Sequence, residues 1–335
     1  MLIRPSRIAL LCLFMFFPAL ALAQEDESIT LRSGIVQRTT RVRRKPAANQ
    51  RVISVLQPSA RVRIINSQAR GGFVRVLLEK GRQGYVSASD IRVDTSLSST
   101  AAAASSSAPC EDSLEDCENI GCAQPGSPQA IFNQAKRHVP TGTASRLLNF
   151  ADFRRLQNQA DEVVDQGSGL SQEERDSLRG FTVSSGTVGE GSLVKIVGFL
   201  ARGLDPHPNT GESVNCRFTE AENNDFHISL APRATNTEFQ GIVVEMIPQD
   251  RPEGWTIPKL RRVKQQRRRV MAIGGLFYDN LHVVNSDASD PIPRQPRRFS
   301  LWEVHPITRF FVCERTNNAC SPGNLSQWTP LEDFQ

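Results

Sequence analysis

The chain has 335 residues, of which 39% are apolar and 22% charged, with 40 Lys and Arg against 35 Asp and Glu. This length has room for two domains of ordinary size, and the apolar share is sufficient to build their cores. The composition excludes a polytopic membrane protein, a collagen-like or coiled-coil rod and a repeat solenoid.

Residues 1–23 have the three parts of a secretory signal. Arg4 and Arg7 make a positive start, residues 8–22 are mostly apolar, and residues 21–23 form an A-x-A cleavage pattern. A membrane anchor is the alternative, but the apolar stretch is short for one. No later part of the chain approaches the 18 continuous apolar residues of a membrane-spanning helix. The sequence therefore predicts a periplasmic or secreted protein that has no membrane span once the signal is removed.

Six cysteines remain after signal removal, and an even number in an exported protein favours disulfides. Three of them lie within residues 110–122, so that full pairing requires at least one bond from this segment to a distant cysteine. We expect Cys313 and Cys320 to close a small loop, and one cysteine of residues 110–122 to pair with Cys216. A zinc site is less favoured because the sequence lacks a C-x-x-C motif.

Residues 30–95 contain short apolar alternations separated by turn residues. The alternations lie at residues 52–56, 62–65, 73–76 and 85–86. Several short strands at such spacing predict a small all-β barrel.

Within this unit, several pieces resemble the bacterial SH3-like (SH3b) family. They are Val42-Arg43 followed by Pro46, then Val52-Ile53, Val62 to Ile65, Gly72 to Val76 and the closing Gly84-Tyr85-Val86-Ser87. The resemblance implies an accessory module that binds cell-wall polymers or peptides. It places Phe73 and Tyr85 in the binding groove, at positions where the family often carries tryptophan.

The charge of residues 30–95 supports a polyanionic partner. The unit has 14 Lys and Arg against three acidic residues. Such a surface attracts a polyanion through counterion release and long-range steering, although a merely solvated charged face is the alternative. We expect Arg41, Arg43, Arg44 and Lys45 to contact an anionic cell-wall or envelope polymer. A peptide or protein partner is the second possibility.

Residues 96–127 read as a linker. The segment is first rich in Ser, Ala and Thr, which is typical of a flexible connection. Residues 110–122 then carry five acidic residues and no basic one. A calcium site is disfavoured because the EF-hand spacing is missing, so we expect an acidic, disulfide-bonded spacer that shields the basic barrel.

Residues 128–335 are predicted to form a second domain, a short helical prelude followed by a β-barrel. Helices are expected at residues 128–138, 150–163 and 171–180, and a helix or basic loop at 258–268. Strands are expected at residues 193–200, 213–218, 225–230, 241–247, 269–277, 299–304 and 307–313. The fold class is therefore mainly β, and the second domain is predicted to be OB-like.

Acidic and histidine residues alternate on the predicted strands of this domain. Asp225 with His227, and Glu303 with His305, are acid-x-His pairs that share one strand face because strand side chains alternate. Together with Glu245 and His282, these six residues are candidate ligands of a divalent metal such as zinc or manganese, the only cofactor the sequence suggests. The sequence favours a structural polar cluster over the metal site, since no HExxH-type motif is present, and a binding or acid–base site without metal is the third possibility.

The second domain also resembles a group of exported bacterial proteins of unassigned activity. The matching pieces are Gly211 to Cys216, Asn224 to Ile228, Trp302 to Pro306, and Cys313, Cys320 and Trp328. No nucleophile motif is found, and export makes nucleic acid a less favoured partner of the basic residues 259–269. The sequence therefore favours a non-catalytic envelope-binding protein, with a metal-dependent hydrolase, possibly a nuclease, as the alternative.

Overall fold

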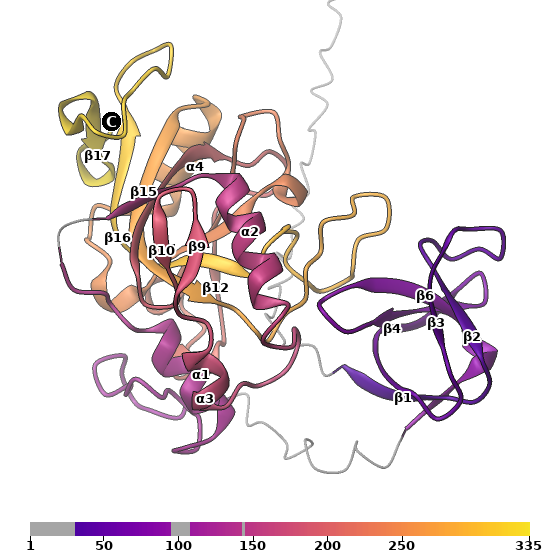
Figure 1. Cartoon of the computed structure of the whole chain (residues 1–335). Coiled ribbons are helices and arrows are strands. Elements are labelled where there is room, and N and C mark those ends of the chain that lie inside the picture. Colours follow the sequence, from indigo (N-terminus) through magenta and orange to yellow (C-terminus); the bar gives the residue numbers. More distant parts are fainter. Residues whose placement is uncertain (1–30, 95–107, 143–144) are drawn as a thin grey trace, which may run out of the picture.

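The computed structural model describes residues 31–94, 108–142 and 145–335, which form two mainly β domains (Figure 1). The predicted signal at residues 1–23 and most of the Ser/Ala-rich segment lie outside the described residues. Within the described ranges, no helix has the length and apolar character needed to cross a membrane.

The first domain is a barrel-like sheet of seven short strands. Their order in the sheet is β3-β2-β6-β5-β4-β1-β7. The strands are β1 (Arg32–Val36), β2 (Thr40–Arg43), β3 (Val52–Leu56), β4 (Arg61–Arg70), β5 (Phe73–Leu77), β6 (Gln83–Ser87) and β7 (Ile91–Val93). Alternate valines such as Val42, Val76 and Val86 fill its core, as the apolar alternation predicts.

Four helices of the second domain begin at side-chain caps. They are α1 (Pro128–Lys136), α2 (Phe150–Ala160), α3 (Gln172–Asp176) and α4 (Ile257–Gln265). Asn149 and Ser171 form capping boxes before α2 and α3, in which the cap side chain and the third helical residue satisfy each other's backbone amides. The last of the three predicted helices before the barrel is shorter than expected and ends at Asp176.

Five strands of the second domain close into a barrel. Around the barrel the order is β11-β13-β14-β16-β15 and back to β11, with only the β14–β16 pair parallel among these five. The strands are β11 (Leu193–Leu200), β13 (Asp225–Ala231), β14 (Ile242–Met246), β15 (Arg269–Tyr278) and β16 (Trp302–Cys313). The helix α4 lies between the third and fourth strands in sequence, and this topology confirms the predicted OB-like barrel.

Short strands extend this sheet or stand beside it. They are β8 (Arg146–Leu148), β9 (Phe181–Val183), β10 (Gly186–Val188), β12 (His207–Asn209) and β17 (Trp328–Pro330). The β9–β10 hairpin lies against α2 in Figure 1. Sequence periodicity did not predict these elements, because three residues are too few to show it.

The strand predicted at residues 213–218 is wrong. The segment is a 3₁₀ turn at Ser213–Asn215, followed by Cys216 and Arg217 in the left-handed region at φ of 51° and 61°. Left-handed residues interrupt an extended chain, so the alternation here does not make a strand. By contrast, the two strands predicted on either side of Pro306 form one continuous strand, β16. A proline is tolerated inside this strand because it lies at an irregularity in the β15–β16 register, opposite Gly274.

The six cysteines of the described residues all form disulfides. The pairs are Cys110–Cys122, Cys117–Cys216 and Cys313–Cys320. Both expected pairings are confirmed. The acidic segment 110–122 is therefore bonded to the second domain, where the amide of Cys122 also donates to the carbonyl oxygen of Ser213.

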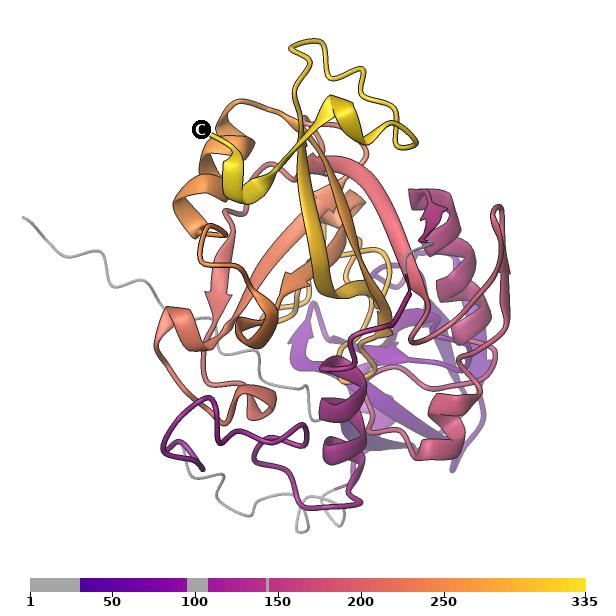
Figure 2. The same ribbon diagram turned by 90° about the vertical axis from the view of Figure 1, so that its left-hand side faces the viewer.

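The basic barrel packs directly on the second domain (Figures 1 and 2). Ile65 and Leu77 of the first domain form an apolar cluster with Val283 and Ile292, which belong to the connection between β15 and β16. Around this cluster, four bases of the first domain pair with acids of the second, in the pairs Arg63–Asp165, Arg70–Asp290, Arg75–Asp290 and Lys80–Glu162. Part of the positive charge of the first domain thus serves to hold the two domains together.

Candidate functional site

The outer face of the barrel carries the acid-x-His pairs. Phe226 and Ile228 of β13 point into the main core, whereas Asp225 and His227 lie on the opposite face, as the period of two predicts. The same division separates Trp302 and Val304 of β16 from Glu303 and His305, and the polar residues are nevertheless buried. The polar face therefore belongs to the interior of the domain and not to its solvated surface.

Two carboxylates of this face are bridged by two cations. His305 Nε2 shares a hydrogen bond with Asp225 Oδ2 at 3.0 Å and lies 3.1 Å from Glu245 Oε2. Both carboxylate oxygens also lie 3.3 Å from Lys136 Nζ. Lys136, in the last turn of α1, also lies 2.9 Å from each carboxylate oxygen of Glu212. His227 Nδ1 lies 2.8 Å from the other oxygen of Glu245. Four of the six predicted metal ligands are thus in one network.

Asp225, Glu245 and His305 offer three ligand atoms within 4.8 Å of one another, which fits a divalent metal by donor type. The ammonium group of Lys136 already lies against both carboxylates. A metal ion bound there competes with this internal cation for the same oxygens.

The charges in this network shift the pKa values of its members. Burial alone would raise the pKa of Glu245, but Lys136 and the two histidines hold it well below its usual range. Burial alone would lower the pKa of His305, but hydrogen bonds to Asp225 and Glu245 raise it to about 9. The surrounding carboxylates likewise keep the pKa of Lys136 well above its usual value despite complete burial. At neutral pH Glu245, His305 and Lys136 are therefore ionised.

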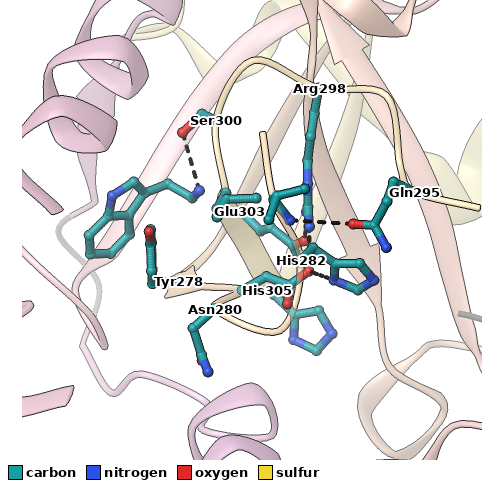
Figure 3. A network of polar contacts seen from close by, with 12 residues as sticks. Tyr278, Asn280, His282, Gln295, Arg298, Ser300, Glu303 and His305 are labelled. Carbon is teal, nitrogen blue, oxygen red and sulfur yellow. Dashed lines mark hydrogen bonds and ion pairs between the residues drawn. The ribbon is translucent and has the colours of Figure 1, made fainter. Parts of the chain in front are cut away.

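A second group of polar residues adjoins the first (Figure 3). His282 Nδ1 lies 2.5 Å from Asp279 Oδ2, and Arg298 forms ion pairs with both Asp279 and Glu303. In Figure 3 the side chains of His282, Arg298, Glu303 and His305 converge from the connection 279–301 and from β16. The remaining two predicted ligands, His282 and Glu303, belong to this group.

The pKa values of Glu303 and Asp279 are shifted in opposite directions. Burial raises the pKa of Glu303 to about 7, with the negative charges of Glu245 and Asp279 adding to the effect and Arg298 opposing it. Burial acts in the same direction on Asp279, but His282 and Arg298 hold its pKa far below the usual range. Neighbouring carboxyl groups whose environments push their pKa values apart are a feature of acid–base sites.

Both groups open on one pocket of about 260 Å³, which we call the OB pocket. It is enclosed by α1, residues 211–217, the strands β13, β14 and β16, and the connection 279–301. Its polar lining consists of Gln129, Asn133, Lys136, Glu212, Ser213, Arg217, His227, Glu245, Asp279, His282 and Glu303, and Phe132, Val214, Leu281 and Pro296 supply apolar surface. Of the six predicted ligands, the pocket brings together His227, Glu245, His282 and Glu303, while Asp225 and His305 lie behind it.

The predicted polymer-binding residues of the first domain differ in exposure. Arg41, Arg44 and Lys45 are exposed, and Arg43 is half-buried with Nη1 donating to the carbonyl oxygen of Gln50 at 3.0 Å.

The two aromatic residues predicted in the groove are less accessible than these cations. Phe73 is half-buried, and Tyr85 is only 7% exposed, with the guanidinium of Arg75 lying 5.8 Å from its ring centroid. The exposed part of this predicted site is therefore its cationic part.

Sequence reasoning missed three charged members of the site. Lys136 was expected only as part of the helix at residues 128–138, and neither Arg298 nor Glu212 was among the predicted site residues. Each is an ion-pair partner of a predicted ligand or of another member of the network. The only available signal was a lysine on the otherwise apolar and amide-bearing sequence of α1.

Comparison with known families agrees with the first domain. Residues 38–92 match the family model described as bacterial SH3 domain, which confirms the SH3b prediction. A search of curated proteins finds no match to the chain. The chain thus contains an SH3b domain and a closed five-stranded barrel in its C-terminal half.

Proposed function

We propose that the protein is exported to the cell envelope, where its SH3b domain binds an anionic wall polymer without catalysing a reaction. Binding of cell-wall components is the general role of SH3b domains, and the match at residues 38–92 supports this class of function. The disulfides and the signal-like sequence of residues 1–23 are consistent with export to an oxidising compartment.

The observation that carries the proposal is the distribution of the basic residues. Those that face the second domain are neutralised by its acids, as described above. Arg41, Arg44 and Lys45 are exposed within five residues of one another, at β2 and the turn that follows it. Among the described residues none of them has a carboxylate oxygen within 4.0 Å, although Lys45 adds, after the hydrogen bond from Ser289, to the lowering of the pKa of the Asp287 carboxyl. Such a group of exposed cations is available to a polyanion, and binding releases the counterions of that polymer.

Sedimentation with purified sacculi tests the proposal. Protein comprising residues 24–335 is pelleted with sacculi over a salt series, beside a variant in which Arg41, Arg44 and Lys45 are changed to Glu. A variant with Arg61, Arg82 and Arg92 changed to Glu is the matched control, since it alters the same charge at other exposed positions of the domain.

We expect pelleting of the wild-type protein to decline as salt rises, because the contacts are electrostatic. It should be lost in the first variant and largely kept in the control. Absence of pelleting at low salt refutes the proposal, and equal loss in both variants shows that only net charge matters. Binding that does not depend on salt points to a peptide or protein partner instead.

A metal-dependent hydrolase, possibly a nuclease, is the second candidate. The observation in its favour is the cluster of Asp225, Glu245 and His305, whose ligand atoms lie within 4.8 Å of one another. Elemental analysis of protein purified without chelators tests it. Zinc or manganese at one ion per chain supports this candidate, whereas a metal-free protein that does not bind either ion on titration eliminates it.

A further inference from the structure

The OB pocket lies where barrels of this topology bind their ligands. OB barrels bind oligonucleotides or oligosaccharides across their second and third strands and the loops between strands one and two and strands four and five. In this barrel those strands are β13 and β14, and the loops are residues 201–224 and 279–301. The pocket is lined from all four of these elements, together with α1 and β16.

The charges of the pocket indicate an uncharged ligand. Four carboxylates line it, from Glu212, Glu245, Asp279 and Glu303. Each already has a cation of the chain beside it, namely Lys136 for the first two and Arg298 for the last two. A further cation is not needed for charge balance, and Lys136 is itself already engaged by carboxylates. The paired charges therefore give an ionic ligand little advantage over an uncharged one.

The hydrogen-bonding groups of the pocket indicate a hydroxyl-rich ligand. Asp279 is 5% exposed, yet its Oδ1 accepts no hydrogen bond from any residue the structure describes. Buried acceptors are nearly always satisfied, so a hydroxyl donor from a ligand or from solvent is expected at this oxygen. Gln129, Ser213 and Arg217 add donors and acceptors at the pocket, and Phe132 adds an apolar surface.

We propose that the OB pocket binds one uncharged sugar unit of the polymer to which the SH3b domain attaches. The volume of about 260 Å³ is just below the range of roughly 300–1,000 Å³ found for drug-sized ligands, and so suits a single small ring. The identity of the polymer rests on the proposed function, but the recognition of a sugar does not. The two domains then hold one chain at two places, which strengthens attachment by raising the effective concentration at the second site.

A variant that fills the pocket tests the inference without altering its ion pairs. Gln129 is half-buried on α1, and its described side-chain hydrogen bond is to Asn133 one turn later. Gln129→Trp places a large ring at the pocket. Gln134→Trp is the matched control, because Gln134 is exposed on the same helix and does not line the OB pocket.

The probe is a set of soluble, uncharged saccharides prepared from purified sacculi, titrated calorimetrically into the wild-type protein, both variants and the Arg41/Arg44/Lys45 charge variant. We expect binding that changes less than twofold between low and high salt. It should weaken at least tenfold in Gln129→Trp and remain within twofold of wild type in Gln134→Trp and in the charge variant. Asp279→Asn, which replaces the acceptor oxygen, should also weaken it.

Each other outcome is decisive. Saccharides that do not bind at millimolar concentration, or that bind Gln129→Trp as well as wild type, refute the sugar pocket, even if sacculi still pellet the protein. Saccharide binding without pelleting refutes the proposed function and leaves the pocket assignment intact. If zinc or manganese chloride binds tightly at one ion per chain and prevents saccharide binding, the pocket is a metal site and not a sugar site. Thermal melting verifies that Gln129→Trp is folded, and a variant that fails this test is replaced by Leu281→Trp.

Discussion

Replacing Lys136 with methionine is expected to destabilise the second domain strongly. The lysine is 5% exposed, and its Nζ lies within 3.3 Å of carboxylate oxygens from Glu212, Asp225 and Glu245. Removing one partner of a buried ion pair costs roughly 3–5 kcal/mol, because the opposite charge remains buried without compensation. Here three carboxylates lose the same cation, so we expect a loss of at least about 3 kcal/mol in the free energy of unfolding at pH 7.

The loss should depend on pH in a defined direction. In the wild-type protein the pKa of Glu245 is well below its usual value, so this carboxylate contributes stability above pH 4.5 or so that disappears as the pH falls through the folded pKa. Without Lys136 the folded pKa rises toward or above the unfolded value. The variant is then most destabilised at neutral pH, and the difference from wild type shrinks as the carboxylates become protonated in acid.

Urea unfolding followed by tryptophan fluorescence measures this effect selectively. The three tryptophans of the chain are Trp255, Trp302 and Trp328, and all are buried in the second domain. Lys80→Met is the control, because Lys80 and Glu162 are both more than half exposed and such a pair contributes roughly 0–1 kcal/mol. A loss below about 1 kcal/mol for Lys136→Met, or one of equal size at pH 7 and pH 4, would refute the ion-pair reasoning.

Three further predictions concern other parts of the molecule. The cysteines of the Cys117–Cys216 disulfide are 99 residues apart, and those of Cys313–Cys320 are 7 apart. In the chain-entropy model, removing the first disulfide should lower the free energy of unfolding by about 4.7 kcal/mol and removing the second by about 2.4 kcal/mol. Reversible unfolding of each double alanine variant measures these losses. The pKa of His305 is raised to about 9 in the folded protein, so its contribution of about 3 kcal/mol to stability is complete below pH 6.5 or so and is lost as the pH rises through 9. His305→Gln should therefore reduce the dependence of the unfolding free energy on pH over this interval. A pH dependence equal to that of the wild-type protein contradicts the assignment. Asp290→Arg removes the partner of two bases of the SH3b domain and should enlarge the radius of gyration in X-ray scattering, whereas the exposed Asp287→Arg should change it less.

The fold was largely predictable because most strands and helices of this sequence carry a clear apolar periodicity or a capping residue. The SH3b strands follow their apolar alternation, and the barrel strands do so from Leu193 to Cys313 with turns between them. The absence of a strand at residues 213–218 was not predictable in the same way. The alternation of this segment is genuine, but the Cys117–Cys216 bond and two left-handed residues determine its conformation, and both depend on distant parts of the chain.

The candidate site was predictable in its residue types and less so in its organisation. All six predicted ligands are buried, and for the five that lie on strands the period of two fixes which residues of a strand share a face. Their partners come from far along the sequence: Lys136 reaches Asp225 and Glu245 across 89 and 109 positions, the differences between their residue numbers. No local sequence pattern indicates such a pairing. The sequence therefore suggested a metal ion at the place where the structure has the ammonium group of Lys136.

The connection 279–301 explains why the two domains belong to one functional unit. Its first residues, Asp279 and His282, line the OB pocket, and its middle packs on the SH3b domain through Val283 and Asp290. Two backbone hydrogen bonds between Asn285 and Arg298 then tie the outgoing half of the connection to the returning half. A shift of the SH3b domain on the proposed polymer would displace the same short segment that carries pocket side chains. If the pocket binds saccharides as proposed, loosening the domain contact at Asp290 should therefore also weaken that binding.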